Sequence, residues 1–152
     1  MNEHHRAATV VLATDGSIYS DAAATYLIES PLLNREFTVH VVHCVPDVTG
    51  DVRSFIRQED INAWHHDEQE KAMRSSVALL RAGKLAFECH GLVGFAPARI
   101  VEYAKQVGAA AIVMGSHGRG SFLDAIIGSV ARRVFAQAHC PVLLVKGGRE
   151  PG

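Results

Sequence analysis

Hydrophobic and polar residues follow two alternating patterns along this chain. Five apolar runs, most of them rich in β-branched residues, predict strands; they are residues 9–14, 37–45, 85–93, 110–114 and 141–145. Between these runs, apolar residues recur every three or four positions, which predicts helices over residues 18–29, 60–81, 97–107 and 129–138. Residues 51–58 follow neither pattern, so the sequence assigns them to no element.

The predicted strands and helices alternate strictly, beginning and ending with a strand. This order predicts an α/β fold in which helices cover both faces of a parallel sheet. Right-handed crossovers then limit the topology to a doubly wound sheet. The chain has 152 residues, 48% of them hydrophobic, which suits a single domain over residues 1–152 with its core between about residues 7 and 147.

Charge and composition exclude several kinds of partner. The chain carries 15 basic and 16 acidic residues, so it has no basic excess with which to neutralise a nucleic-acid backbone. No apolar run reaches the roughly 18 residues that a membrane-spanning helix needs, and the first residues show no apolar signal-peptide core. We therefore expect a cytoplasmic protein that binds neither nucleic acid nor membrane. The three cysteines, Cys44, Cys89 and Cys140, are odd in number and widely spaced, so we expect buried, reduced thiols.

Ligands of doubly wound sheets bind beyond the carboxyl ends of the strands, so the loops there are the first candidates for a site. Asp15 follows the first predicted strand, where it either accepts hydrogen bonds from a ribose hydroxyl or base amino group, or caps the turn and the next helix. At the end of the second predicted strand, His43 suits packing or hydrogen bonding. The strand edge at Cys44 offers backbone N–H and C=O groups to an adenine-like ring.

A glycine-rich loop at residues 115–121 follows the fourth predicted strand, and Gly128-Ser129 opens the last helix. Glycines let backbone N–H groups approach an anion, and a helix N-terminus adds free N–H groups and a favourable dipole. Ser129 either donates its hydroxyl to a phosphate or caps the helix, and Arg119 adds a positive charge. The glycines alone also suit a merely flexible loop. The segment lacks the lysine of a P-loop and the G-x-G-x-x-G pattern of dinucleotide-binding folds.

The spacing Gly115-x2-Gly118-x9-Gly128-Ser129 closely resembles the G-x2-G-x9-G-[ST] motif of the universal stress protein family, in its ATP-binding branch. The resemblance covers the chain except residues 47–70. Further segments that resemble the family are residues 9–17, the strand end at His43, residues 94–98, 113–120 and 140–145. One departure is Ala13-Thr14, which precedes the turn at Asp15 where many family members have proline.

The resemblance implies a Rossmann-like, five-stranded parallel sheet of order 3-2-1-4-5 and a homodimer that pairs through the strand at residues 141–146. It further implies a cytoplasmic stress-response regulator or sensor that binds ATP, ADP or AMP, with any Mg²⁺ or Mn²⁺ held through phosphate oxygens and water. Asp15 would contact the nucleoside, the Cys44 backbone the adenine edge, and Gly128 the phosphates. The complete set of expected binding residues is Ala13, Thr14, Asp15, Cys44, Met114, Gly115, His117, Gly118, Arg119, Gly128, Ser129 and Val130.

Two other functions remain open at this stage. The same loop suits a slow ATPase or nucleotide hydrolase, but no general base stands out near the phosphates, and Asp124 is the only carboxylate in the loop. We therefore predict no catalytic residue. Alternatively, the dimer surface or residues 47–70 dock onto a protein partner, with the nucleotide as a modulator.

The remaining histidines have simpler interpretations. His65 and His66, with the carboxylates at residues 67, 68 and 70, suggest a metal site, but a solvated helix face explains them better, and no matching cluster stands out elsewhere. His117 suits a loop role without catalysis, since the loop offers it no fixed base or nucleophile. We therefore predict no metal ligand among the side chains.

Overall fold

A computed structural model describes residues 6–117 and 127–147. The strands are β1 (Ala8–Ala13), β2 (Phe37–Val45), β3 (Phe87–Val93), β4 (Ala111–Gly115) and β5 (Val142–Val145). The helices are α1 (Ile18–Glu29), α2 (Gly50–Arg53), α3 (Gln58–Ala82), α4 (Ala96–Gln106) and α5 (Ser129–Gln137). Each predicted strand and helix is therefore present, and α2 is an additional short helix within the segment that the sequence did not assign.

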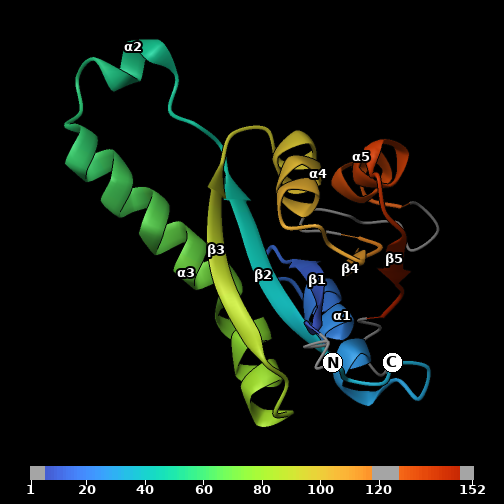
Figure 1. The fold of residues 1–152 in the computed structure, drawn as a ribbon. Coiled ribbons are helices and arrows are strands. Elements are labelled where there is room, and N and C mark those ends of the chain that lie inside the picture. Colours follow the sequence, from blue (N-terminus) through green and yellow to red (C-terminus); the bar gives the residue numbers. More distant parts are fainter. Residues whose placement is uncertain (1–5, 118–126, 148–152) are drawn as a thin grey trace, which may run out of the picture.

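The five strands form one sheet in the order β3-β2-β1-β4-β5, and every neighbouring pair is parallel (Figure 1). This arrangement confirms the predicted doubly wound α/β fold and its strand order. Because the order reverses at β1, the carboxyl ends of β1, β2 and β4 lie side by side, with a crevice between the loops that follow them.

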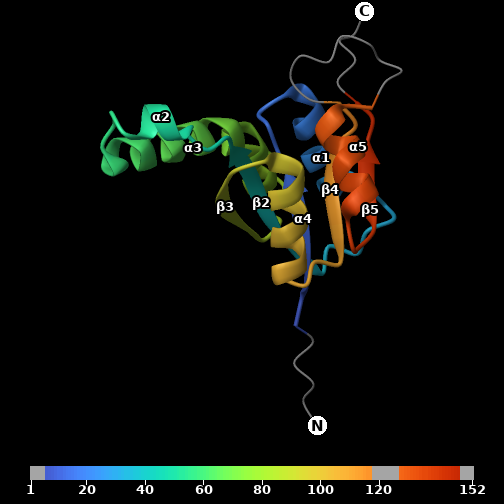
Figure 2. The same ribbon diagram turned by 90° about the horizontal axis from the view of Figure 1, so that it is seen from above.

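Side chains of the central strands alternate between two cores, one on each face of the sheet. Val10 and Leu12 pack with α1 and α3, whereas Val11 and Ala13 pack with α4 and α5. Figure 2 shows the two helix pairs on opposite sides of the sheet. Buried strands with apolar residues on both faces are the expected signature of a parallel sheet, which explains the continuous apolar runs in the sequence.

Some boundaries differ from the prediction for local reasons. β3 begins at Phe87 rather than at residue 85, because the Leu85 amide donates to the Leu80 carbonyl and Lys84 adopts a left-handed φ of 58°. α3 begins at Gln58, and its first part, together with α2, projects away from the sheet (Figure 2). In α3, His65 is buried, which corrects the prediction that both histidines there lie on a solvated face.

The three cysteines are free thiols, as expected, but Cys89 is exposed rather than buried because β3 is an edge strand. Cys44 and Cys140 are half-buried. Among residues 6–117 and 127–147, no helix has both the length and the apolar character needed to cross a bilayer.

Candidate functional site

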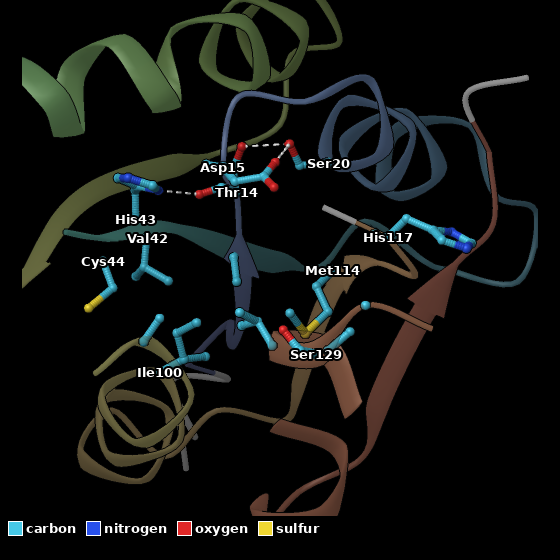
Figure 3. Close-up of a pocket in the computed structure, with 16 residues that line it drawn as sticks. Thr14, Asp15, Ser20, Val42, His43, Cys44, Ile100, Met114, His117 and Ser129 are labelled. Carbon is cyan, nitrogen blue, oxygen red and sulfur yellow. Dashed lines mark hydrogen bonds between the residues drawn. The ribbon is translucent and has the colours of Figure 1, made fainter. Parts of the chain in front are cut away.

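A cavity of about 380 Å³ opens where the carboxyl ends of β1, β2 and β4 meet the N-terminus of α5 (Figure 3). Every predicted site residue that the structure describes lines it: Ala13, Thr14, Asp15, Cys44, Met114, Gly115, His117, Gly128, Ser129 and Val130. The other two, Gly118 and Arg119, lie outside the described residues. The strand ends and the glycine motif, far apart in the sequence, therefore surround one space.

Asp15 is held at the start of α1. Its Oδ1 accepts hydrogen bonds from the Ser17 amide at 2.9 Å and from the Ser20 hydroxyl at 3.2 Å. Gly16, with φ of 79°, provides the left-handed conformation that lets the chain turn from β1 into the helix. Asp15 thus caps the turn, as one of its two interpretations predicts, and it also lines the cavity. Its contact with a nucleoside stays a prediction.

Thr14 anchors the end of β1 from inside the protein. Its hydroxyl is 2.9 Å from the Ser20 hydroxyl and 3.2 Å from that of Ser76 on α3, and it accepts a hydrogen bond from the Gly16 amide at 3.2 Å. The Thr14 side chain is buried. This network fixes the turn at the position where many family members carry proline.

His43 connects two of the strand ends. Its Nδ1 lies 2.7 Å from the Thr14 carbonyl oxygen (Figure 3). Since a carbonyl oxygen only accepts, Nδ1 carries the hydrogen and donates it. The Thr14 amide in turn donates to the Val42 carbonyl at 2.9 Å, so β1 and β2 stay paired up to the edge of the cavity.

The start of α5 forms the side of the cavity opposite Asp15 and His43. Gly128 is the N-cap, with φ of −56° and ψ of 151°, and no side chain caps the helix. Of the two roles considered for Ser129, N-capping of α5 is therefore excluded, since Ser129 is the first residue of the helix. The donation of its hydroxyl to a phosphate stays a prediction. The first amides of a helix have no intrahelical acceptor, so Ser129, Val130 and Ala131 direct unsatisfied donors and the positive end of the helix dipole toward this region.

Gly115 brings β4 against α1. A Cβ built at this glycine would lie 2.7 Å from the Tyr19 carbonyl carbon, closer than any side chain tolerates. One residue on, buried Ser116 accepts the Gly128 amide hydrogen on its carbonyl oxygen at 2.8 Å. Close packing against α1 thus requires a residue without a side chain at Gly115. The bond between Gly128 and Ser116, the residue after β4, positions the start of α5.

His117 lies at the opposite end of the cavity from Cys44 (Figure 3). Its Nδ1 is 2.9 Å from the Ser116 hydroxyl, and its ring centroid is 5.2 Å from that of Tyr19. The Nε2 atom is buried and makes no hydrogen bond to the described residues. Among the described residues, the partners that hold this ring are Ser116 and Tyr19, and neither is a carboxylate.

Cys44 contributes a neutral thiol to the cavity wall. Burial raises its pKa to about 11, although Arg99 acts in the opposite direction. The thiol donates weakly to the Gly94 carbonyl at 3.5 Å. At neutral pH this sulfur is protonated and a poor nucleophile, so the contribution of this position to a ligand is packing and backbone contact.

Several lining residues were not predicted from the sequence. They are Ser20, Val42, His43, Ala96, Ile100 and Ala131. The sequence predicts only packing or hydrogen bonding for His43, and the apolar members carry no signal beyond strand or helix periodicity. Together with Met114, these apolar side chains form a wall suited to a flat ring, while Asp15 and the α5 amides provide polar groups at other points of the same cavity.

Known proteins match this chain along nearly the whole length of the chain. The model of the Universal stress protein family matches residues 7–146. The chain belongs to the universal stress protein family. A member from Methanocaldococcus jannaschii is 31% identical over 145 residues, which cover 90% of this chain and 81% of that protein. A member from Thermus aquaticus is also 31% identical, covering 91% of this chain and 98% of the relative.

Other universal stress proteins differ in length or carry a nucleotide. A relative from Mycobacterium tuberculosis is 28% identical, and this chain spans about half of that protein's length, 47%. The Archaeoglobus fulgidus universal stress protein in complex with dAMP has a TM-score of 0.65 and 30% identity, covering 91% of this chain and 97% of that one. A universal stress protein in complex with cAMP has the same fold, with a TM-score of 0.67. It is 22% identical, and the match covers 91% of this chain and 96% of that one.

Proposed function

We propose that this universal stress protein binds an adenine nucleotide, ATP in particular, in the cavity between β1, β2, β4 and α5. The observation that carries the proposal is the convergence of the Asp15 carboxylate, an apolar wall and the N-terminus of α5 on one cavity of about 380 Å³. That combination suits a ribose, a flat base and a phosphate chain respectively. The dAMP complex of the Archaeoglobus relative supports the ligand class.

The proposed contacts follow from the position of each group. The adenine ring lies against Val42, Ile100 and the backbone at Cys44, and Asp15 accepts from a ribose hydroxyl. The phosphates lie at the amides of Ser129 and Val130; Gly118 and Arg119, which lie outside the described residues, are proposed as further phosphate contacts from the motif alone. Each contact made by a described residue uses a group that the fold already holds in place, so little ordering of these groups opposes binding.

Binding rather than hydrolysis is the proposed activity. Asp15 is the one carboxylate in the described lining, and its Oδ1 already accepts two hydrogen bonds. A single carboxylate does not build a metal site of its own, so a Mg²⁺ or Mn²⁺ ion is proposed to bind through phosphate oxygens and water. The part of the lining that the structure describes likewise offers no paired carboxylates with which to activate an attacking water.

The biological role that we propose is that of a cytoplasmic stress-response regulator or sensor that acts as a homodimer through β5. β5 is an edge strand of the sheet, and its side chains Val142, Leu143 and Leu144 are half-buried, so pairing with a second copy would cover an apolar edge. The nucleotide would then report on the cell's energy state to a partner of the dimer.

A protein partner is a second candidate function, favoured by one observation. The segment from α2 into α3 carries exposed apolar side chains, with Phe55 90% and Trp64 45% exposed. Exposed aromatic residues of this kind mark interaction surfaces. If this segment docks a partner, a Phe55→Ser, Trp64→Ser variant will lose from pulldowns a protein that wild type retains; identical pulldowns would count against a role for this surface.

The experiment that tests nucleotide binding is mass spectrometry of small molecules released from freshly purified, denatured protein. We expect adenine nucleotide from wild type and none from Gly128→Val, whose side chain would occupy the phosphate region. If no nucleotide is released and ATP titrated onto the protein also fails to bind, the proposal is wrong.

A further inference from the structure

A second group of polar side chains lies on the sheet outside the nucleotide cavity. His40 of β2 is in register with Glu88 of β3, and His90 follows Glu88 by two residues. Side chains two residues apart on a strand share a face, so all three project from the same side of the sheet. Tyr103 of α4 reaches this cluster from the helix that covers that side.

Glu88 presents one carboxylate oxygen to each histidine. His40 Nε2 is 3.0 Å from Glu88 Oε2, and His90 Nε2 is 3.7 Å from Glu88 Oε1. One ligand atom from each of the three residues lies within 4.8 Å of the other two. The imidazole rings are stacked, with centroids 5.1 Å apart.

One buried nitrogen of the cluster has no hydrogen-bond partner among residues 6–117 and 127–147. His90 Nε2 is out of contact with water, and its 3.7 Å approach to Glu88 is too long for a hydrogen bond. A buried imidazole nitrogen with no partner is energetically unfavourable unless another species satisfies it. This nitrogen, directed at a carboxylate that also faces a second imidazole, lies where a cation would be bound.

His40 is already oriented as a metal-binding imidazole is. Its Nδ1 is 2.8 Å from the Tyr103 hydroxyl, which leaves Nε2 as the nitrogen that faces Glu88. Ligating histidines commonly use the second ring nitrogen in a hydrogen bond of this type, which fixes the tautomer and the ring plane. Tyr103 is therefore a positioning residue for His40 rather than a ligand.

We propose that His40, Glu88 and His90 bind a divalent transition-metal ion, with Zn²⁺ the best match. Two imidazole nitrogens and one carboxylate oxygen are a ligand set for Zn²⁺, whereas Mg²⁺ and Ca²⁺ prefer oxygen ligands. The Glu88 side chain is 56% exposed, so the fourth coordination position opens to solvent and a water molecule fills it. The bound ion would join β2 and β3 beneath α4.

Only small side-chain movements are needed to complete the site. Tetrahedral Zn²⁺ places its ligand atoms about 3.3 Å apart, given metal–ligand distances of about 2.0–2.1 Å. With one ligand atom taken from each residue, the three atoms lie within 4.8 Å of one another, and each histidine Nε2 is within 3.7 Å of one of the two Glu88 oxygens. Rotation of the partly exposed Glu88 and His90 side chains brings the third pair of ligand atoms together.

The test is a competition titration of chelator-stripped protein with Zn²⁺ against a chromophoric chelator. Wild type should bind one Zn²⁺ per chain, and Glu88→Gln and His90→Gln should each weaken binding by at least tenfold. His66→Gln is the matched control, because His66 and Glu70 form an exposed pair at 3.9 Å on α3 that belongs to no three-ligand group within the described part of the chain. The proposal would be overturned if wild type and both cluster variants bound Zn²⁺ with equal affinity. It would also be overturned if His66→Gln lost Zn²⁺ binding.

Two further measurements separate ligation from folding. Circular dichroism melts of the stripped proteins should show that Glu88→Gln keeps the wild-type fold, since Glu88 is exposed on an edge strand. In nitrogen-15 NMR, Zn²⁺ should shift the Nε2 resonances of His40 and His90, and Tyr103→Phe should weaken affinity several-fold without loss of the fold. Shifts confined to other histidines would contradict the assignment.

Discussion

Gly128 donates its amide hydrogen to the carbonyl oxygen of Ser116 at 2.8 Å, which joins the beginning of α5 to the residue after β4. This bond turns the first amides of α5 toward the space between the strand ends. Because Ser116 also donates its amide to the Val145 carbonyl at 3.0 Å, the start of α5 is tied through one residue to β5 as well. The phosphate side of the cavity is therefore part of the sheet's own hydrogen-bond network.

Close packing at Gly115 predicts a stability effect. Gly115→Ala places a methyl group 2.7 Å from the Tyr19 carbonyl carbon, so β4 and α1 must separate. We expect a loss of about 1–3 kcal/mol in the free energy of unfolding, measured by urea denaturation. Gly50→Ala is the control, since nothing lies within 4 Å of its added Cβ. Equal stability of the two variants would contradict this packing argument.

The charge on Asp15 predicts an effect on affinity with little effect on the fold. Asp15→Asn keeps an oxygen that accepts from the Ser17 amide but loses the charge-assisted bond to a ribose hydroxyl. We expect ATP to bind about tenfold more weakly by calorimetry, because a hydrogen bond to a charged group contributes about 1.5–3 kcal/mol. Asp47→Asn, an exposed carboxylate 3.6 Å from Arg53, should bind as wild type does. Unchanged affinity in Asp15→Asn would remove this residue from the site.

How far the sequence alone predicts this structure differs between the fold and the site. The helix layers follow from apolar periodicity, since Val10 and Val11 face opposite cores, whereas the strand order follows only from the resemblance to the family. Asp15 is predicted at the site because it follows the first strand, and Gly128 because of the spacing of the glycine motif. The inner lining does not, because Val42 and Ile100 carry only the apolar signal of any core residue. The His40–Glu88 pair depends on β2–β3 register, which no local pattern encodes.

The β5 edge predicts how to separate dimerisation from nucleotide binding. The Pro141 carbonyl accepts from Ile112 of β4, and the Val145 carbonyl accepts from Ser116, the residue after β4. Alternate residues such as Leu144 therefore direct their backbone groups outward. Leu144→Pro removes an outward N–H while leaving the β4 ladder intact. We expect light scattering to report a dimer for wild type and a monomer for this variant, with ATP binding retained. A dimeric variant would place the interface elsewhere.

The raised pKa of Cys44 predicts slow, pH-dependent alkylation. Its pKa is about 11, so the reactive thiolate is scarce at pH 7.5, and the alkylation rate should rise about tenfold per pH unit up to that value. Iodoacetamide labelling followed by mass spectrometry should modify exposed Cys89 faster. Saturating ATP should slow labelling of Cys44 but not of Cys89. Equal rates for the two cysteines, with or without ATP, would contradict the assignment of Cys44 to the site.

The most direct test of nucleotide binding is an ATP titration of wild type, Gly128→Val and Gly50→Val by isothermal calorimetry. The backbone at Gly128 has φ of −56°, which valine adopts without strain, so the variant should fold and only the phosphate region should be filled. We predict that Gly128→Val weakens ATP binding at least thirtyfold, about 2 kcal/mol, while Gly50→Val binds as wild type does. Equal ATP affinity in all three proteins would contradict the account.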